Sequence, residues 1–267
     1  MDMKQHGYLK WLAAMMLTVA AGGACAEESK DSYLTMMLGY ESSSGDYGTT
    51  TSTDIVTVPV SALYETGRWA MKLTVPYIRV TGDGTVLVSG GGRGWRATTT
   101  TTTTTARTTS SGLGDIVALL AYNVYAADNV DAGIDLAGRV KFGTASKTLG
   151  TGMNDYAAQL YGYRAFGDFT PSLVLGYEVL GSSAEVPLDN VLYGTVGADY
   201  RFGELSNGGL EYRYVQQASA TAAEQRELTL YLSREIGRDT FLRGYLLKGY
   251  ADGSPDTGFG ISLSAVY

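Results

Sequence analysis

Histidine and cysteine are nearly absent from this sequence, which has one of each, His6 and Cys25. Both lie within the first 26 residues, so a chain that loses this segment contains neither. Without them a disulfide cannot form, and the imidazole and thiolate ligands of most zinc sites are missing. Nucleophilic catalysis through a Ser-His or Cys-His pair is excluded for the same reason. We therefore predict that the protein is not an enzyme and holds no metal and no cofactor.

The first 26 residues have the three parts of a secretory signal peptide. A segment with two lysines precedes an apolar run from Trp11 to Val19, and Ala24-Cys25-Ala26 completes a stretch of small residues. As a membrane-spanning helix the stretch is short, because about 20 apolar residues are needed. Cys25 could carry a lipid, but Gly22 stands where lipoprotein sites usually have leucine. We predict cleavage after Ala26, with residues 1–26 as the signal peptide and 27–267 as one mature domain.

Basic residues and long apolar runs are also scarce. Cleavage removes two of the 20 basic and one of the 27 acidic residues, which leaves a formal net charge of −8. Nucleic-acid binding needs a basic face, so we predict no nucleic-acid partner. No apolar run after residue 26 is long enough for a helix across a bilayer. A chain that spans a membrane without helices must form a closed barrel, because every backbone polar group needs a partner there.

Alternating segments are what the sequence has in abundance. In the last one, Gly258 to Tyr267, every second residue is apolar and the residues between them are small. Successive side chains of an extended chain point to opposite faces, so this segment has one apolar and one small face. An apolar outer face and a terminal aromatic are typical of the closing strand of an outer-membrane barrel. We expect the barrel-assembly machinery to bind the chain through this strand, which ends at Tyr267.

Twelve such segments predict an all-β fold, a twelve-stranded antiparallel up-and-down transmembrane β-barrel with short periplasmic turns and long external loops. Short and long connections alternate strictly, which places both termini in the periplasm. The longest external loop, 82–112, is a low-complexity segment that includes Thr98 to Thr105. We expect the barrel in the outer membrane of a Gram-negative bacterium, surrounded by lipid. The twelve segments are 33–41, 55–65, 69–81, 113–125, 130–142, 156–166, 170–180, 191–202, 209–216, 226–236, 240–250 and 258–267.

Aromatic residues gather near the ends of these segments, which predicts two girdles at the lipid–water boundaries. Those near the short turns include Tyr64, Trp69 and Phe241. Two irregularities are expected as well. Pro76 cannot donate a ladder hydrogen bond, so a bulge there would turn Arg79 inward. The neighbours Leu246 and Leu247 interrupt the alternation near the end of the chain, which predicts a second bulge and leaves the direction of Lys248 open.

Inward-facing charges form the candidate site. A turn near Ser206 would place Arg201 opposite Glu211 and Asp199 opposite Arg213, and opposite charges on neighbouring strands stabilise a sheet. A turn near Ala127 would bring Asp115 against Arg139, or against Lys141 after a slip of two residues. The candidate lumen-lining residues are Lys72, Arg79, Asp115, Asp131, Asp135, Arg139, Lys141, Glu178, Asp199, Arg201, Glu211 and Arg213.

Two interpretations of these charges remain open. They could be structural ion pairs that fill a narrow barrel, which would make the protein a non-conducting structural or surface-binding barrel. They could instead line a path for small solutes, because rings of charge set the selectivity of pores. Catalysis by a carboxylate pair is disfavoured, since Asp131 and Asp135 would lie about 13 Å apart along one strand and paired-carboxylate glycosidases need roughly 5–9.5 Å. A channel for small solutes is the leading hypothesis.

Several phrases resemble the outer-membrane barrels known as transporter-like proteins of the phenol meta-degradation pathway. The resemblance covers most of residues 33–267 and implies passive transport of small aromatic or hydrophobic solutes. The Thr98–Thr105 tract departs from the family pattern. The phrases that carry the resemblance are Val75 to Gly82, Gly114 to Ala118, Val140 to Thr144, Gly150 to Gly152, Asn154 to Tyr156 and Leu247 to Asp256.

Overall fold

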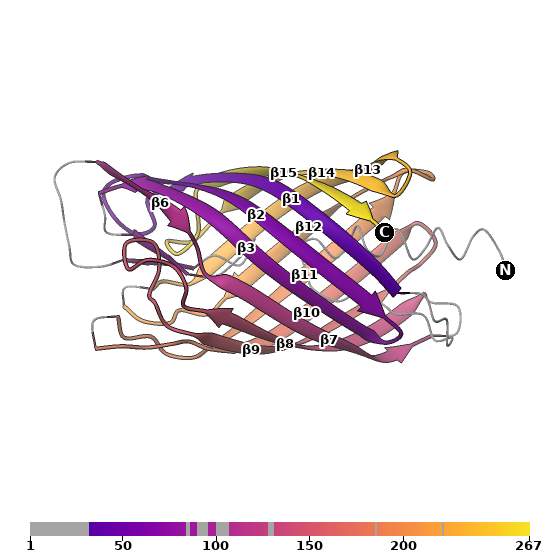
Figure 1. The fold of residues 1–267 in the computed structure, drawn as a ribbon, viewed down its shortest axis with the longest axis horizontal. Coiled ribbons are helices and arrows are strands. Elements are labelled where there is room, and N and C mark those ends of the chain that lie inside the picture. The colour runs from indigo at the N-terminus through magenta and orange to yellow at the C-terminus, as the bar shows by residue number, and fades with distance from the viewer. Residues whose placement is uncertain are drawn as a thin grey trace.

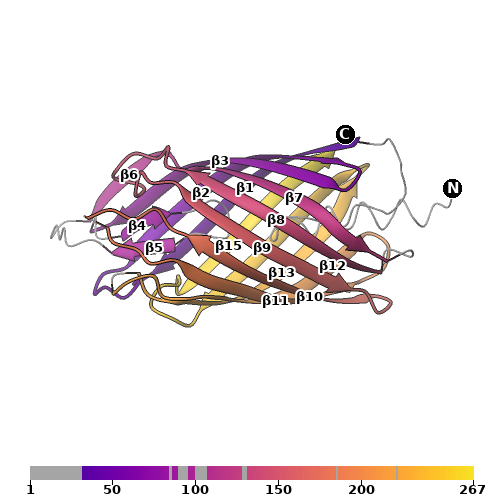
Figure 2. The ribbon, with the colours of Figure 1, turned by 90° about the horizontal axis from the view of Figure 1, so that it is seen from below.

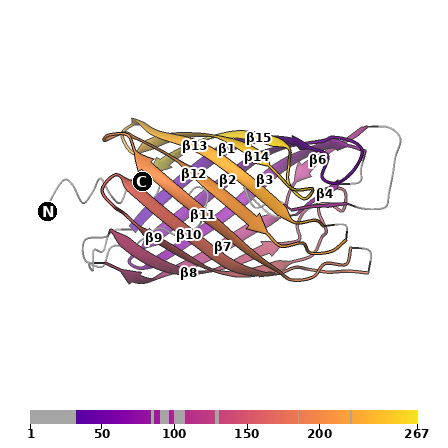
Figure 3. The ribbon, with the colours of Figure 1, turned by 180° about the vertical axis from the view of Figure 1, so that it is seen from behind.

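The structure is a computed structural model that describes residues 32–83, 86–89, 96–99, 107–127, 131–184, 186–220 and 222–267. This part of the chain is built of β-strands, and it has no helix long and apolar enough to cross a membrane. The strands are tilted around a common long axis, and Figures 1 and 3 show this wall from the front and from behind. The predicted signal peptide, 1–26, lies outside the described residues, as does most of the Thr98–Thr105 tract.

Thirteen strands form one antiparallel sheet with the twelve positions of a closed barrel, because β6 and β7 together occupy a single position beside β3. The remaining two strands, β4 (Val86–Ser89) and β5 (Arg96–Thr99), pair only with each other. The wall strands are β1 (Ser32–Gly45), β2 (Thr53–Thr66), β3 (Trp69–Gly82), β6 (Thr108–Leu113), β7 (Ile116–Ala126), β8 (Ala132–Phe142), β9 (Asp155–Arg164), β10 (Phe169–Val179), β11 (Val191–Arg201), β12 (Ser206–Val215), β13 (Gln225–Gly237), β14 (Thr240–Gly249) and β15 (Thr257–Val266).

The first and last wall strands close the barrel. β1 pairs with β15 along a register that runs from Thr35–Val266 to Ser44–Thr257, and its other edge pairs with β2. The seam stays hydrogen-bonded to the end of the chain, since Tyr267 N–H donates to the Leu34 carbonyl at 2.9 Å. The predicted twelve-stranded barrel is therefore confirmed, with its terminal segments paired to each other.

Exposure alternates along the wall strands, with apolar side chains on the outside. In β1, Met36 and Leu38 are 41% and 54% exposed, whereas Thr35 and Met37 are 2% and 7% exposed. The exposed side chains of the other wall strands are also largely Leu, Val, Ile, Tyr and Phe. Exposing such an apolar surface to water is unfavourable, whereas contact with the hydrocarbon core of a bilayer is not.

Exposed aromatic residues lie at strand ends, as the girdles require. Tyr64 and Trp69 flank one short turn and are 41% and 44% exposed. The prediction that Phe241 belongs to this girdle is wrong, because its side chain is 1% exposed and faces the interior. Its neighbour Leu242 takes the outward position in β14, and a strand has only one outward residue in every two.

The prediction that Pro76 turns Arg79 inward is wrong. β2 and β3 pair without interruption, with Pro59 opposite Pro76, and Arg79 is exposed on the same face as Tyr77. The irregularity lies in the neighbouring strand instead. Tyr77 pairs with Leu113 and Thr74 with Val117, so that strand has one extra residue across the break between β6 and β7. The missing donor of Pro76 thus disturbs its partner strand, where Gly114 N–H donates to the Pro76 carbonyl at 2.8 Å.

The bulge predicted at Leu246 and Leu247 is also absent, because β14 keeps one register with β13 and β15 across both residues. Leu247 is a less exposed, inward-facing residue, and Lys248 is exposed on the outer face. Leu247 is an apolar residue on the inner face, so it breaks the alternation of the sequence without any change of register. The register shift in this hairpin lies instead between Glu235 and Gly237, at the turn.

Candidate functional site

The candidate residues lie mostly on the inner face of the wall. We call the end of the barrel with the short connections the turn end and the opposite end the loop end. Arg79 is the exception on the outer face, and Asp131 immediately precedes β8 at the turn end. The candidates at the less exposed positions of the wall are Lys72, Asp115, Asp135, Arg139, Lys141, Glu178, Asp199, Arg201, Glu211 and Arg213.

A buried triad of charges lies near the loop end of β7, β8 and β9. Lys141 Nζ is 3.0 Å from Asp115 Oδ2 and 2.9 Å from Asp155 Oδ2, and the three side chains are 1–4% exposed. The other carboxylate oxygens accept backbone hydrogen bonds from two loops, Asp115 Oδ1 from Ala145 N–H and Asp155 Oδ1 from Gly181 N–H. The triad therefore joins three strands to loops 143–154 and 180–190. Arg139 and Lys141 were the two predicted partners of Asp115, and the ion pair is formed with Lys141.

Arg139 reaches across one strand to a different partner. Its Nη2 lies 2.6 Å from Glu178 Oε1 of β10, and both side chains are partly exposed to the interior. On the same stretch of wall, Tyr193 donates a hydrogen bond to Gln159 at 2.8 Å. The Arg139–Glu178 pair links β8 and β10, which are separated by β9. Matching residues across adjacent strands of a hairpin could therefore not predict it.

A second polar network lies on the wall formed by β11 to β14. Asp199 accepts hydrogen bonds from Asn207 at 2.7 Å and from Tyr231 at 2.9 Å. Arg243 lies over the Tyr231 ring, 3.8 Å from its centre, and its guanidinium is 3.9 Å from Glu211. Arg243 and Tyr231 were not among the candidates. The sequence does indicate their direction, because each alternates with exposed leucines in its strand and must therefore face inward.

The predicted pairs in the hairpin of β11 and β12 are wrong. Arg201 pairs with Asn207, and Asp199 pairs with Gly209, because β12 begins at Ser206 and the turn is shorter than expected. Glu211 therefore faces Arg243 instead of Arg201. Arg213 lies 3.9 Å from Glu227 of β13.

Arg201 provides a weak ion pair, since it bonds Asp168 at 2.8 Å while the two side chains are 26% and 54% exposed. We predict that Arg201→Ala costs at most about 1 kcal/mol of unfolding free energy, because water screens such pairs. Urea unfolding of the folded barrel in detergent, followed by tryptophan fluorescence, would measure the change. A loss several times larger would show that this pair has a greater role than its exposure indicates.

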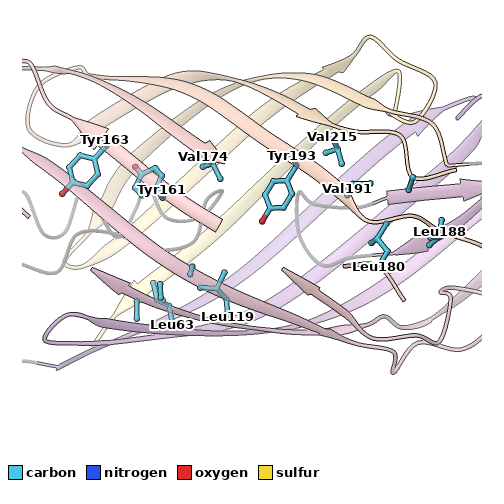
Figure 4. Packing of buried hydrophobic residues seen from close by; sticks show 14 of the residues in the cluster. Leu63, Leu119, Tyr161, Tyr163, Val174, Leu180, Leu188, Val191, Tyr193 and Val215 are labelled. Carbon is cyan, nitrogen blue, oxygen red and sulfur yellow. The ribbon is translucent and has the colours of Figure 1, made fainter. Parts of the chain in front are cut away.

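Four inward-facing tyrosines lie flat on the wall, each over the glycine that it pairs with on a neighbouring strand. A Cβ atom on any of the four glycines would clash with the tyrosine ring above it. On Gly133, for example, it would lie 2.6 Å from Tyr163 Cε1. Two of the rings are shown in Figure 4, those of Tyr163 and Tyr193. The four pairs are Tyr163 with Gly133, Tyr193 with Gly176, Tyr231 with Gly209 and Tyr245 with Gly260.

The hairpin of β4 and β5 is anchored on the inner face at the loop end, and Figure 2 shows it at that end of the barrel. Val86, the first residue of β4, is 3% exposed and belongs to a buried cluster with Ile55, Ile78 and Val80 of β2 and β3. These three alternate with outward residues, so the cluster lies inside the wall. Val86 thus lies on the inner side of the barrel at the loop end. Within the described ranges, no three His, Cys, Asp or Glu side chains gather in a way that could hold a metal ion.

No protein-family model and no curated protein sequence matches this chain. Solved structures do match. The COG4313 outer membrane channel from Pseudomonas putida F1 aligns with a TM-score of 0.65 and 12% identity, covering 93% of this chain and 100% of that one. The NanC porin aligns with a TM-score of 0.54 and 11% identity, covering 87% of this chain and 98% of that one. At such identities the likeness is one of fold, and this chain shares with both the closed antiparallel β-barrel of outer-membrane proteins.

Proposed function

We propose that the protein is a passive channel for small solutes in the outer membrane of a Gram-negative bacterium. One observation carries the proposal: the inner ion pairs and four inner tyrosines lie along the wall. The ion pairs described above join strands that are adjacent or separated by one strand, and each of the four tyrosines lies flat on a glycine. A conducting lumen needs this arrangement, whereas a filled barrel needs side chains that cross the axis.

Aromatic solutes are the class that we propose for this path. Tyrosine rings line the inner face, and Tyr161 and Tyr163 stack with their centres 5.7 Å apart. Apolar side chains such as Leu63 and Leu119 lie on the same inner face (Figure 4), so a ring could travel along a partly apolar wall. The resemblance to the transporter-like proteins of phenol degradation supports the same class.

Ion conduction through single barrels in a planar bilayer would test the channel. We expect stepwise current at neutral pH, and benzyl alcohol should interrupt it more than cyclohexylmethanol, which has a similar size but no aromatic ring. A fully folded barrel that stays silent would contradict the channel. Equal interruption by the two alcohols would contradict the aromatic preference alone.

A non-conducting barrel is the second candidate function, and the buried position of Val86 favours it. Val86 begins the hairpin and packs on the inner face at the loop end, so the hairpin would narrow the mouth. Deletion of residues 84–106 separates the two candidates. In a channel the deletion should raise the conductance, while a barrel closed along its whole length should stay silent without the loop.

A further inference from the structure

Near the turn end of the lumen, two buried oxygen atoms accept no hydrogen bond. They belong to Asp135 of β8 and Asn123 of β7, whose side chains are 1% and 2% exposed. Asn123 Nδ2 donates to Asp135 Oδ1 at 2.6 Å and to the Tyr125 carbonyl at 3.2 Å, which fixes the direction of the amide. Asn123 Oδ1 and Asp135 Oδ2 are left without partners. A buried acceptor without a donor destabilises the folded protein, and a charged one does so more strongly.

A second carboxylate adds to this site. Glu65, at the turn end of β2, lies close enough to Asp135 for the two to interact electrostatically, and neither forms a salt bridge with a basic side chain of the described residues. The facing wall adds more negative charge, because Tyr161 lies within range of Asp199 and Glu211 as well as Asp135. Three inward-facing bases lie on that wall, and each is engaged elsewhere: Arg243 with Glu211, Arg213 with Glu227 and Arg201 with Asp168. We call Glu65, Asn123 and Asp135 the acceptor pocket.

Small side chains and aromatic rings border the acceptor pocket. Ala70, Ala121 and Ala137 follow one another on β3, β7 and β8 in directly paired positions, beginning opposite Glu65. Their short side chains line the wall between Glu65 and Asp135, and all three are buried. On the far side of β8, the stacked rings of Tyr161 and Tyr163 lie on β9, and Figure 4 shows them side by side. The faces of aromatic rings attract cations.

We propose that the acceptor pocket binds the ammonium group of a small primary amine that carries an aromatic ring. An ammonium group has three N–H donors and one positive charge. The donors match the two free acceptors, Asn123 Oδ1 and Asp135 Oδ2, and the charge matches the carboxylates of Glu65 and Asp135. The ring would lie against Tyr161 and Tyr163. This inference deepens the proposed function by naming the charge and the binding group of the solute, and it rests on that function only for the solute's route.

Phenethylamine, 2-phenylethanol and potassium chloride are the probes for a test on the folded barrel in detergent at neutral pH. We expect phenethylamine to raise the unfolding temperature in a saturable way, while 2-phenylethanol, which has the same shape but no charge, and potassium produce no saturable shift. Asp135→Asn should weaken phenethylamine binding about tenfold or more, as the loss of a buried charge-assisted hydrogen bond predicts. Glu65→Gln provides an independent variant if Asp135→Asn folds poorly. The matched control is Glu227→Gln, a buried inner carboxylate at the loop end, which should leave binding unchanged.

Four outcomes would overturn the inference: no saturable shift with phenethylamine, equal shifts with 2-phenylethanol, a saturable shift with potassium alone, or unchanged phenethylamine binding in both Asp135→Asn and Glu65→Gln. The measurement needs no current, so it is separate from the test of the channel. A silent barrel that binds phenethylamine contradicts the proposed function and keeps the pocket. A conducting barrel that fails to bind it contradicts only the pocket.

Discussion

Lys141→Met is expected to destabilise the folded barrel by about 3–5 kcal/mol, because removing one member of a buried ionic cluster leaves its partners uncompensated. Two buried carboxylates, Asp115 and Asp155, would then face each other without the ammonium group that lies about 3 Å from both. Loops 143–154 and 180–190 should loosen too, since each donates a backbone hydrogen bond to one of these carboxylates. Urea unfolding in detergent would measure the stability, and limited proteolysis would report on the loops.

Lys248→Met is the matched control for that experiment. Lys248 is exposed on the outer face near the same end of the barrel, so its loss should change the unfolding free energy by less than about 0.5 kcal/mol. If both variants lose the same small amount, the triad contributes no more than a surface lysine, and its proposed role in holding the two loops is wrong.

Gly176→Ala is expected to displace the Tyr193 ring and to cost about 1–3 kcal/mol, the usual range for an added carbon in a packed site. A Cβ on Gly176 would overlap the ring atoms Cζ and Cε2, so the ring must leave the wall and lose its 2.8 Å hydrogen bond to Gln159. A displaced ring projects into the lumen, so single-channel conductance should fall as well. Unfolding and bilayer recordings on the same preparation would measure both effects.

Gly138→Ala is the control for the glycine substitution. Gly138 lies in β8 with no atom within 4 Å of an added Cβ, so alanine should be neutral or stabilising by up to about 1 kcal/mol. In a Tyr193→Ala background the cost of Gly176→Ala should shrink, because the ring is no longer there to displace. An unchanged cost would place the effect in the backbone and not in the ring.

The fold could be predicted from the sequence because alternation of apolar and small residues depends on each strand alone. The registers between strands could not, because a shift by two or four residues leaves every side chain on the same face. Arg201 is such a case: it was placed on the inner face correctly and given Glu211 as its partner, while the structure pairs it with Asn207. Partners of inner charges are therefore harder to predict than their direction.

The contacts that define the candidate site depend on register and on the curvature of the wall. Tyr193 lies over Gly176 only because those two residues are directly paired, and nothing local to either strand indicates it. Arg139 and Glu178 meet across an intervening strand. Pro76 shows a third limit, because the sequence located an irregularity correctly along the barrel and assigned it to the wrong strand.

The seam between β1 and β15 has a consequence for how the molecule is made. Because the two ends of the chain supply adjacent strands, every partly built wall has two unpaired edges, and such edges readily join those of other chains. Loss of Thr257 to Tyr267 would therefore not yield a slightly smaller cylinder. It would leave an open sheet with two unpaired edges, so the addition of β15 decides between a closed barrel and an aggregation-prone sheet.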